Sequence, residues 1–534
     1  MPNAEEMKMQ FSKRDNRVES FDSTKDSEHN MTSSDSVKRK PGKYQQLLKE
    51  FSQESSAGGI NKVFSSKPLL IRLIWVLLCV VCYGAMIYLS YIAIKTYFDK
   101  PTSTYVEVSF ETDMTFPSVT ICNLNKFRKD ALQNLPGLNK IINNKKSDRA
   151  NVDEENLFFQ KMKRRSGMTL PAGGMNFSKT NQVSSKDILE NAMLAASVKY
   201  SEKDLKKAGH QFEDLVSSCR WMGIQCNSKS SYFKNYWRNT WNWKYGNCYT
   251  FNFGLSEGNN TVTPLTTTKA GPKYGLTIDL FIEQAQYIRQ LTEEAGVKVV
   301  IINGKQHPFP FQEGTAVSPG TATAIALRKE VIERVDRYSN RSCVEDTEIF
   351  DSIYNEDASL AYTIQSCLDT CLVEQQIKEC NCSDARYARN GKACSNTTEN
   401  ECIVNVETKY RKDEYGCIKR CPQRCRSVSY RTTISEAQLS AQFMKDQRES
   451  LNTSTKRRNA TKTEKLFKQD FLRIKIYFEE LNLVRIHQEF SYTLTSLLSD
   501  IGGQLGLWVG LSVITFAEVG DLILSIILLV FSRN

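Results

Sequence analysis

The last apolar stretch of the chain, Phe490 to Phe531, limits the possible folds more than any other feature of the sequence. Its 42 residues are long enough to cross a bilayer, yet they include the acids Asp500, Glu518 and Asp521. An acidic side chain at membrane depth costs about 2.5 to 3.5 kcal/mol on insertion scales, so these acids are expected to face water or one another. The sequence therefore predicts a membrane span that lines a pore.

Glycines at positions 502, 503, 506 and 510 interrupt the same stretch. Glycine allows helices to approach closely, or leaves backbone carbonyls free to line a cavity. Glu518 and Asp521 are three residues apart, so a helix presents them on one face. The simpler interpretation is a single-pass anchor with a small-residue packing face, but such an anchor does not need acids inside the membrane.

A second apolar run, Leu73 to Ile94, predicts another membrane span near the N-terminus. Its 22 uncharged residues correspond to about 33 Å of helix, enough to cross the hydrocarbon. Lys62, Lys67 and Arg72 precede this run, and the positive-inside rule places that side in the cytoplasm. Two spans put both termini in the cytoplasm and about 390 residues outside the cell.

Cysteines and sequons indicate the same topology. Fourteen of the sixteen cysteines lie between Cys122 and Cys425, a density typical of disulfides in an oxidising compartment. Asn30 heads a sequon in the N-terminal tail and is expected to stay bare. Seven sequons of the middle region are predicted to be glycosylated: Asn176, Asn259, Asn340, Asn381, Asn396, Asn452 and Asn459.

Other functions find little support in the sequence. The net charge of +11 is spread along the chain without a basic helix, so no nucleic-acid partner is expected. Gly254 to Gly258 matches the G-x-S-x-G motif of hydrolases by letters, but a sequon stands where that motif needs a helix. The cysteine spacings allow zinc ligation, yet no paired His lies near them. The chain is therefore expected to be no enzyme and to hold no metal or cofactor.

The run GGQLGLWVGLSVITFAEVGD resembles the second transmembrane segment of the degenerin/epithelial sodium channel superfamily. In that family a Gly-x-Ser tripeptide is the selectivity filter, and here it corresponds to Gly510, Leu511 and Ser512. The resemblance implies a trimer, a homotrimer in the simplest case, whose pore helix is interrupted at the tripeptide. Stacked carbonyl and hydroxyl oxygens there would replace the water shell of the permeant ion, Na⁺.

The resemblance also assigns roles around the filter. Ser499 occupies a position where the degenerin branch tolerates only small residues, and Gly502 and Gly503 complete the implied gate. The implied pore acids, whose ring would raise the local cation concentration, are Asp500, Glu518 and Asp521. Before the first span, Gly58 and Gly59 stand where the family has a His-Gly pair, so this chain lacks the histidine.

Two more motifs extend the resemblance, at Thr115–Asn125 and Tyr245–Asn252. The implied fold is an α+β membrane protein with two transmembrane helices and a large disulfide-rich extracellular domain made of palm, β-ball, knuckle, finger and thumb. The implied location is the plasma membrane, and the implied blocker is amiloride. The expected domains are a cytoplasmic tail and pre-span loop at 1–68, helices at 69–97 and 490–531, the extracellular domain at 98–489 with a finger at 126–244 and a thumb at 343–425, and a cytoplasmic end at 532–534.

Disulfide pairs follow from the resemblance. Cys367 and Cys371 are four residues apart, as are Cys417 and Cys421, so antiparallel helices would present matching faces. The implied pairs are Cys122 with Cys248, Cys219 with Cys226, Cys343 with Cys425, Cys367 with Cys421, Cys371 with Cys417, Cys380 with Cys402, and Cys382 with Cys394. The alternating strip from Phe467 to Glu489 predicts a strand that leads from this domain into the pore helix.

The stimulus that opens the channel is less constrained. Proton-gated relatives carry Pro and Trp in the turn before the first thumb cysteine, and the turn at 337–343 has neither. Protease-activated or constitutive members rely on cut loops, and this chain has basic runs at 163–165 and 456–458. An ATP-gated two-span trimer is an alternative from another class, but the filter tripeptide argues against it.

An extracellular amidated neuropeptide of the FMRFamide type fits best by elimination. Its positive charges need carboxylates and its rings need aromatic partners. The expected site is therefore Asp153, Glu154, Phe158 and Phe159. A dense set of Trp and Tyr residues between Trp221 and Tyr245 is interpreted mainly as buried packing between finger, thumb and first span.

Overall fold

The structure, a computed structural model, falls into two compact units, which are treated separately below. The first comprises Met1–Ile94 with Thr495–Asn534, and the second comprises Lys95–Leu494. The structure describes residues 62–63, 68–144, 185–228, 230–335, 343–345, 351–355, 360–387, 392–394, 397–452, 464–510 and 512–531.

The first unit contains the apolar helices. Helix α3, Leu69–Asp99, has 31 residues and is the one helix in the described ranges that is long and apolar enough to cross a membrane. The C-terminal stretch divides into α15 (Leu494–Gln504), a π-helical turn (Leu505–Val509) and α16 (Val513–Phe531). The helix therefore begins at Leu494 and not at Phe490, because Phe490 is the last residue of a strand.

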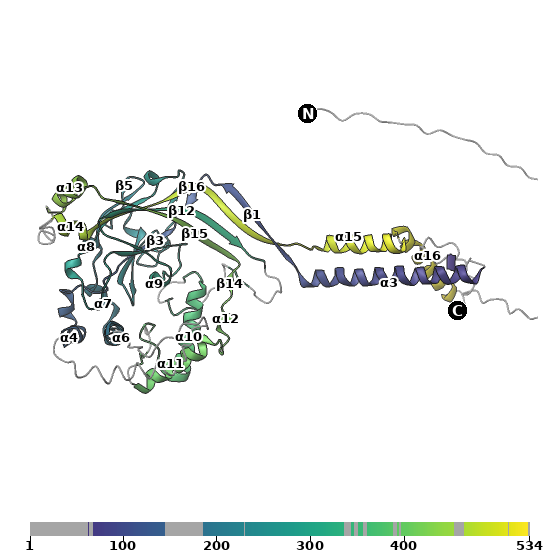
Figure 1. The fold of residues 1–534 in the computed structure, drawn as a ribbon, viewed down its shortest axis with the longest axis horizontal. Helices are drawn as coiled ribbons and strands as arrows, with labels where there is room; N and C mark the ends of the chain where they lie inside the picture. The colour runs from purple at the N-terminus through teal and green to yellow at the C-terminus, as the bar shows by residue number, and fades with distance from the viewer. Residues whose placement is uncertain are drawn as a thin grey trace, which may run out of the picture. The chain divides into compact units, whose positions relative to one another are not determined.

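The second unit is built on a seven-stranded sheet, here the palm sheet. Its order is β15-β12-β16-β9-β4-β5, and β1 also pairs with β16. Figure 1 shows β12, β15 and β16 running side by side. The strands are β1 (Thr102–Phe110), β4 (Val216–Trp221), β5 (Ile224–Gln225), β9 (Leu276–Phe281), β12 (Thr321–Glu333), β15 (Arg426–Gln438) and β16 (Phe471–Phe490).

A five-stranded sheet, here the ball sheet, lies beside the palm sheet in the order β11-β10-β3-β7-β6. All six residues of β3 and all six of β7 are buried, as expected for central strands of an apolar run. One hydrophobic core contains side chains of both sheets. The strands are β3 (Ser118–Asn123), β6 (Trp237–Asn242), β7 (Gly246–Phe251), β10 (Val297–Ile302) and β11 (Thr315–Val317).

Short helices form the finger around a second hydrophobic cluster that includes Phe127, Leu138 and Met193. The expected finger at 126–244 is thus only partly helical, because β4 to β6 fall within it and belong to the two sheets. The helices are η1 (Ala131–Asn134), α4 (Pro136–Asn144), α6 (Ser185–Ser197), α7 (Glu202–Ala208), α8 (Phe212–Leu215) and η2 (Lys234–Tyr236).

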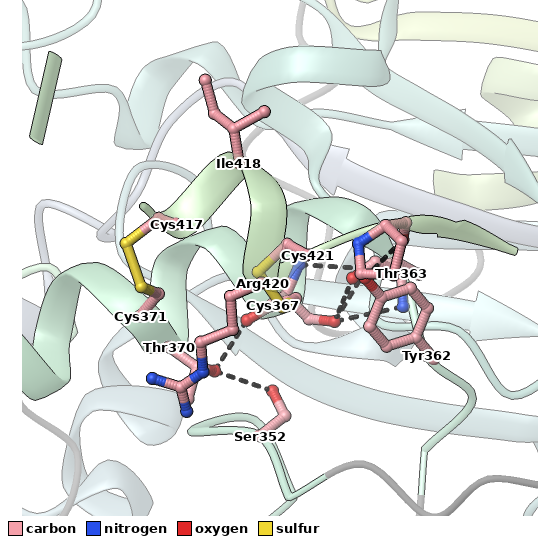
Figure 2. Close-up of a disulfide and its surroundings, with 12 residues drawn as sticks. Ser352, Tyr362, Thr363, Cys367, Thr370, Cys371, Cys417, Ile418, Arg420 and Cys421 are labelled. Carbon is pink, nitrogen blue, oxygen red and sulfur yellow. Dashed lines mark hydrogen bonds between the residues drawn. A yellow bond between two sulfur atoms is a disulfide. The ribbon is translucent and has the colours of Figure 1, made fainter. Parts of the chain in front are cut away.

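The thumb consists of α10 (Ile364–Cys380), α11 (Thr397–Arg411) and α12 (Cys417–Arg420). Thr363 caps α10, because its side chain accepts a hydrogen bond from Ser366 N while the Ser366 hydroxyl accepts one from Thr363 N. Figure 2 shows two rungs of the disulfide ladder, Cys367–Cys421 and Cys371–Cys417, which fasten α12 onto α10. All seven disulfides that the resemblance implied are present.

Helices α13 (Ala441–Asn452) and α14 (Glu464–Asp470) precede β16. The predicted strand at 467–489 therefore starts later, at Phe471, because Phe467 packs from α14 into a cluster with Phe281 and Met444. The remaining short elements are β2 (Met114–Thr115), β8 (Thr266–Thr267), η3 (Pro272–Tyr274), η4 (Gln284–Gln286), α9 (Pro310–Glu313), β13 (Cys343–Val344) and β14 (Gln423–Arg424).

Candidate functional site

The C-terminal apolar helix is broken at Gly510. This residue has a left-handed φ of 66°, a conformation that glycine adopts without the steric cost of a Cβ atom. Its N–H donates to the carbonyl of Gly506 at 3.1 Å, which closes the preceding helical turn. The last carbonyls of an interrupted helix lack helical donors, so the break leaves backbone oxygens available to a ligand.

Ser512 starts the next helix. Its N–H donates to Thr515 Oγ1 at 3.3 Å, and Thr515 N donates to Ser512 Oγ at 3.4 Å. This reciprocal pair satisfies two donors at the start of α16, in the manner of a capping box. The tripeptide thus ends one helix and begins another, with Leu511 itself outside the described residues.

Small residues form one face of α15 and of the π-helical turn that follows it. Ser499, Gly502, Gly503 and Gly506 follow the spacing i, i+3, i+4, i+7, which places them along one side of a helix. A Cβ atom added at any of these three glycines would meet no described atom within 4 Å. Within the part of the chain that the structure describes, nothing covers this face.

The predicted pore acids lie on both sides of the break. Asp500 is exposed on α15, and Asp521 is exposed on α16. Residue 518 belongs to α16 three positions before Asp521, but its side chain lies outside the described part. The backbone therefore keeps positions 518 and 521 on one helical face.

The two strands that continue into the apolar helices are neighbours in the palm sheet. Strand β1 pairs antiparallel with β16 from Thr102 opposite Phe490 to Phe110 opposite Asn482. Both the backbone N–H and the hydroxyl of Ser491 donate to the carbonyl of Pro101, at 2.9 Å and 3.1 Å. The chain segments that follow α3 and precede α15 are therefore hydrogen-bonded to each other.

Several predicted site residues lie outside the described part of the chain. They are Gly58 and Gly59 of the pre-span loop, Asp153, Glu154, Phe158 and Phe159 of the expected peptide site, and the sequons at Asn176, Asn340, Asn396 and Asn459. Asn259 is half-buried, and its side chain accepts a hydrogen bond from Arg238 at 2.8 Å. Asn381 is exposed at the end of α10, and Asn452 ends α13.

The aromatic residues between 221 and 245 divide into two groups. Trp221, Phe233 and Trp237 are buried, as expected, but in the core shared by the palm and ball sheets and not at the predicted join between finger, thumb and first span. Trp241 and Trp243 instead line a cavity of about 690 Å³. Sequence reasoning missed this cavity, because its walls come from segments more than 200 residues apart.

The structure supports neither the hydrolase motif at Gly254 to Gly258 nor zinc binding by the closely spaced cysteines. Ser256 is buried, its hydroxyl accepts a hydrogen bond from Asn260 N at 3.2 Å, and the following residues form a turn closed by a bridge from Leu255 to Thr261. No helix follows, as the hydrolase motif requires. The cysteines with zinc-like spacing are oxidised, so the thiolates that zinc needs are absent from them.

Comparison with known proteins matches residues 51–522 to the family described as Amiloride-sensitive sodium channel. The chain is 25% identical to the epithelial sodium channel subunit alpha of Neoceratodus forsteri, over 91% of this chain and 80% of that protein. It is 24% identical to the human subunit beta, over 91% of this chain and 82% of that protein. It is 28% identical to acid-sensing ion channel 1 of Gallus gallus, over 89% of this chain and 83% of that protein.

Proposed function

Because the chain belongs to the amiloride-sensitive sodium channel family, we propose that α15, the break at Gly510 and α16 form its sodium-selective pore. The observation that carries this proposal is the break itself, which separates two helices inside the acid-bearing apolar stretch. Oxygens of Gly510, Leu511 and Ser512 replace part of the water shell of Na⁺, while Glu518 and Asp521 attract cations on the cytoplasmic side.

The uncovered face of α15 supports an assembly of several copies. Glycines with no described atom within 4 Å of an added Cβ allow the helices of other copies to approach closely. Three copies in a closed ring bring Asp500, Ser499 and the filter of each subunit to one axis. The simplest assembly is a homotrimer in the lipid bilayer, with amiloride as its pore blocker.

The channel is placed in the plasma membrane with the disulfide-rich unit outside the cell and both termini inside. Seven disulfides support an oxidising environment for that unit, and the basic residues before α3 support a cytoplasmic N-terminus. Mapping of glycopeptides by mass spectrometry tests this orientation. Sugar is expected at exposed sequons such as Asn381. Sugar on Asn30 would contradict the proposed topology, because it would put the N-terminal tail outside the cell.

For the stimulus, an extracellular amidated peptide of the FMRFamide type is proposed. The support is the sequence at 153–159, where Asp153 and Glu154 precede Phe158 and Phe159 and offer charge and ring partners to such a peptide. Protons or proteolysis are the alternatives within the family. The double variant Asp153→Asn with Phe158→Ala is expected to raise the half-activating peptide concentration, and an unchanged value would remove this site from consideration.

Expression of the chain alone in oocytes tests the proposal as a whole. Amidated peptides, acid, protease and ATP are applied in turn, and one of the first three is expected to evoke a sodium current that amiloride blocks. The matched variants Ser512→Ala and Glu518→Gln are expected to change permeation by monovalent cations. A current evoked by ATP alone, or no current under any stimulus, would contradict the proposed function.

A further inference from the structure

The cavity of about 690 Å³ has the size and lining of a binding site for an organic molecule. It lies within the disulfide-rich unit, between the end of α6, strand β6, the segment around Phe309 and the thumb residues near Arg386. Its aromatic walls are held in place by ring contacts. Trp243 lies 5.8 Å from Phe311 between ring centroids, and His307 stacks on Tyr354 at 4.1 Å.

Asp369, a buried acid of the cavity wall, already has hydrogen-bond partners. Asp369 accepts hydrogen bonds from the Tyr354 hydroxyl at 2.7 Å and from Gln365 Nε2 at 2.8 Å. Tyr387 adds a longer contact from its hydroxyl at 3.5 Å. Burial raises the pKa of the Asp369 carboxyl. This carboxylate therefore offers little to an incoming cation.

Two other charges of the cavity wall have partners of opposite sign. Glu202 pairs with Lys206 at 2.8 Å along α7. Arg386 donates to Asp384 at 2.8 Å and to Glu407 at 2.7 Å. These pairs neutralise the charges that the wall would otherwise present to a ligand.

Lys126, unlike these charged residues of the cavity wall, has no partner of opposite charge among the described residues. It lines the same cavity, and its ammonium group makes no hydrogen bond or ion pair with any residue in the described ranges, although it lies 5.1 Å from the centroid of its neighbour Phe127. Glu190, the acid whose charge acts on Lys126, forms its ion pair with Lys244 instead. Burial lowers the pKa of Lys126 to about 8, and Lys244 adds to this effect while Glu190 opposes it. The cavity thus contains a half-buried cation that is paired with no anion among the described residues.

We propose that this cavity binds an aromatic carboxylate, an organic anion whose carboxylate pairs with Lys126 and whose ring packs among the Trp and Phe side chains. An ammonium group that is half-buried in a cavity and has no anionic partner among the described residues can form a charge-assisted pair with an incoming carboxylate. The aromatic walls favour a ring on the same molecule. The volume is far larger than an inorganic anion needs, which selects an organic one.

Binding of N-acetyl-tryptophan and of its neutral amide to the purified full-length channel tests this proposal. The two probes differ in one charge, so their affinity ratio reports the ion pair. The carboxylate is expected to bind about tenfold more tightly than the amide at pH 7. Lys126→Met is expected to abolish this preference while binding of the amide persists. Lys129→Met removes a neighbouring exposed lysine and is expected to keep the preference.

A second measurement needs no variant and covers a failure of Lys126→Met to fold. The carboxylate preference of the wild-type channel is expected to fall as the pH rises above about 8, because Lys126 then loses its charge. Equal binding of the two probes at pH 7, or a preference that survives at pH 10 or in Lys126→Met, would overturn the proposal. Neither result depends on channel current, so the proposed function is tested separately.

Discussion

Asp279 and Arg473 form a bidentate ion pair between β9 and β16, with Nε to Oδ1 at 2.5 Å and Nη2 to Oδ2 at 2.9 Å. The two residues face each other in the strand register, and the Asp279 side chain is only 3% exposed. The Arg473 guanidinium also lies 4.3 Å from the centroid of the Phe443 ring in α13. This pair therefore joins α13 to the palm sheet at β16, the strand that precedes α15.

Replacing Arg473 by Met is expected to lower the free energy of unfolding by about 3 kcal/mol, because the buried carboxylate of Asp279 loses its bidentate partner and keeps only the longer contact to Arg220 at 3.7 Å. Thermal unfolding of the purified channel measures the effect. Arg328→Met is the matched control, since the Arg328–Glu479 pair lies on the same sheet but is exposed. The expected loss of stability in this control is much smaller, because water screens the exposed pair. Equal shifts in the two variants would show that burial does not strengthen the inner pair.

The Asp470 carboxyl makes stability depend on pH. Burial raises its pKa to about 6 and Glu283 adds to the rise, while a hydrogen bond from Gln284 N opposes it. The folded state thus holds this proton more tightly, so the stabilisation is complete below about pH 4 and is lost as the pH rises through 6. Asp470→Asn is expected to be more stable than wild type by about 2 to 3 kcal/mol at pH 7 and equal to it at pH 4. The measurement is the unfolding midpoint of both proteins at pH 4 and pH 7. A difference between them that is the same at both pH values would contradict the expectation.

The disulfides are expected to differ in their contribution. Cys122–Cys248 closes 126 residues, and its removal is expected to cost about 5 kcal/mol in loop entropy. Cys371–Cys417 lies inside the loop already closed by Cys367–Cys421, so the effective loop is short and the expected cost is about 2 to 3 kcal/mol. Paired Cys→Ser variants and their unfolding midpoints measure both. A larger loss for the thumb rung would reverse this ranking.

Ser512 is expected to set selectivity through its hydroxyl. Ser512→Ala removes the acceptor for Thr515 N and should weaken the start of α16 by about 1 kcal/mol. The expected result is a lower ratio of sodium to potassium permeability, read from reversal potentials in mixed solutions. Ser512→Thr keeps a hydroxyl at the cap and serves as the control, with a smaller change expected. Identical permeability ratios for Ser512→Ala and wild type would show that the Ser512 hydroxyl caps α16 without setting selectivity.

Ser499 lies on the small-residue face of α15, so a bulky group there should hold the pore open. Ser499→Cys modified with a positively charged thiol reagent is expected to give a sustained current. Cys79 and Cys82 are the free thiols in the described chain, so the experiment uses a background in which both are Ala. A modified channel that stays silent would argue against this face as the gate.

The sequence by itself determined the local features and their order. The family resemblance of the last apolar segment is confirmed by the family that residues 51–522 match. The spacing of Cys367 and Cys371 agrees with one turn of α10, and the break at Gly510 follows from a glycine placed before a capping Ser. Such features depend on a few neighbouring residues and on helix periodicity, and both can be read from the sequence alone.

Only the tertiary structure decided which of similar residues are packed and which are available. Trp237 is buried in the core while Trp243 faces a cavity, although both stand in the same aromatic run. Lys126 is one of many lysines, and it becomes a candidate anion partner only because Glu190 is bonded to Lys244. Burial and charge pairing arise from contacts between segments far apart in the chain, and no local pattern specifies them.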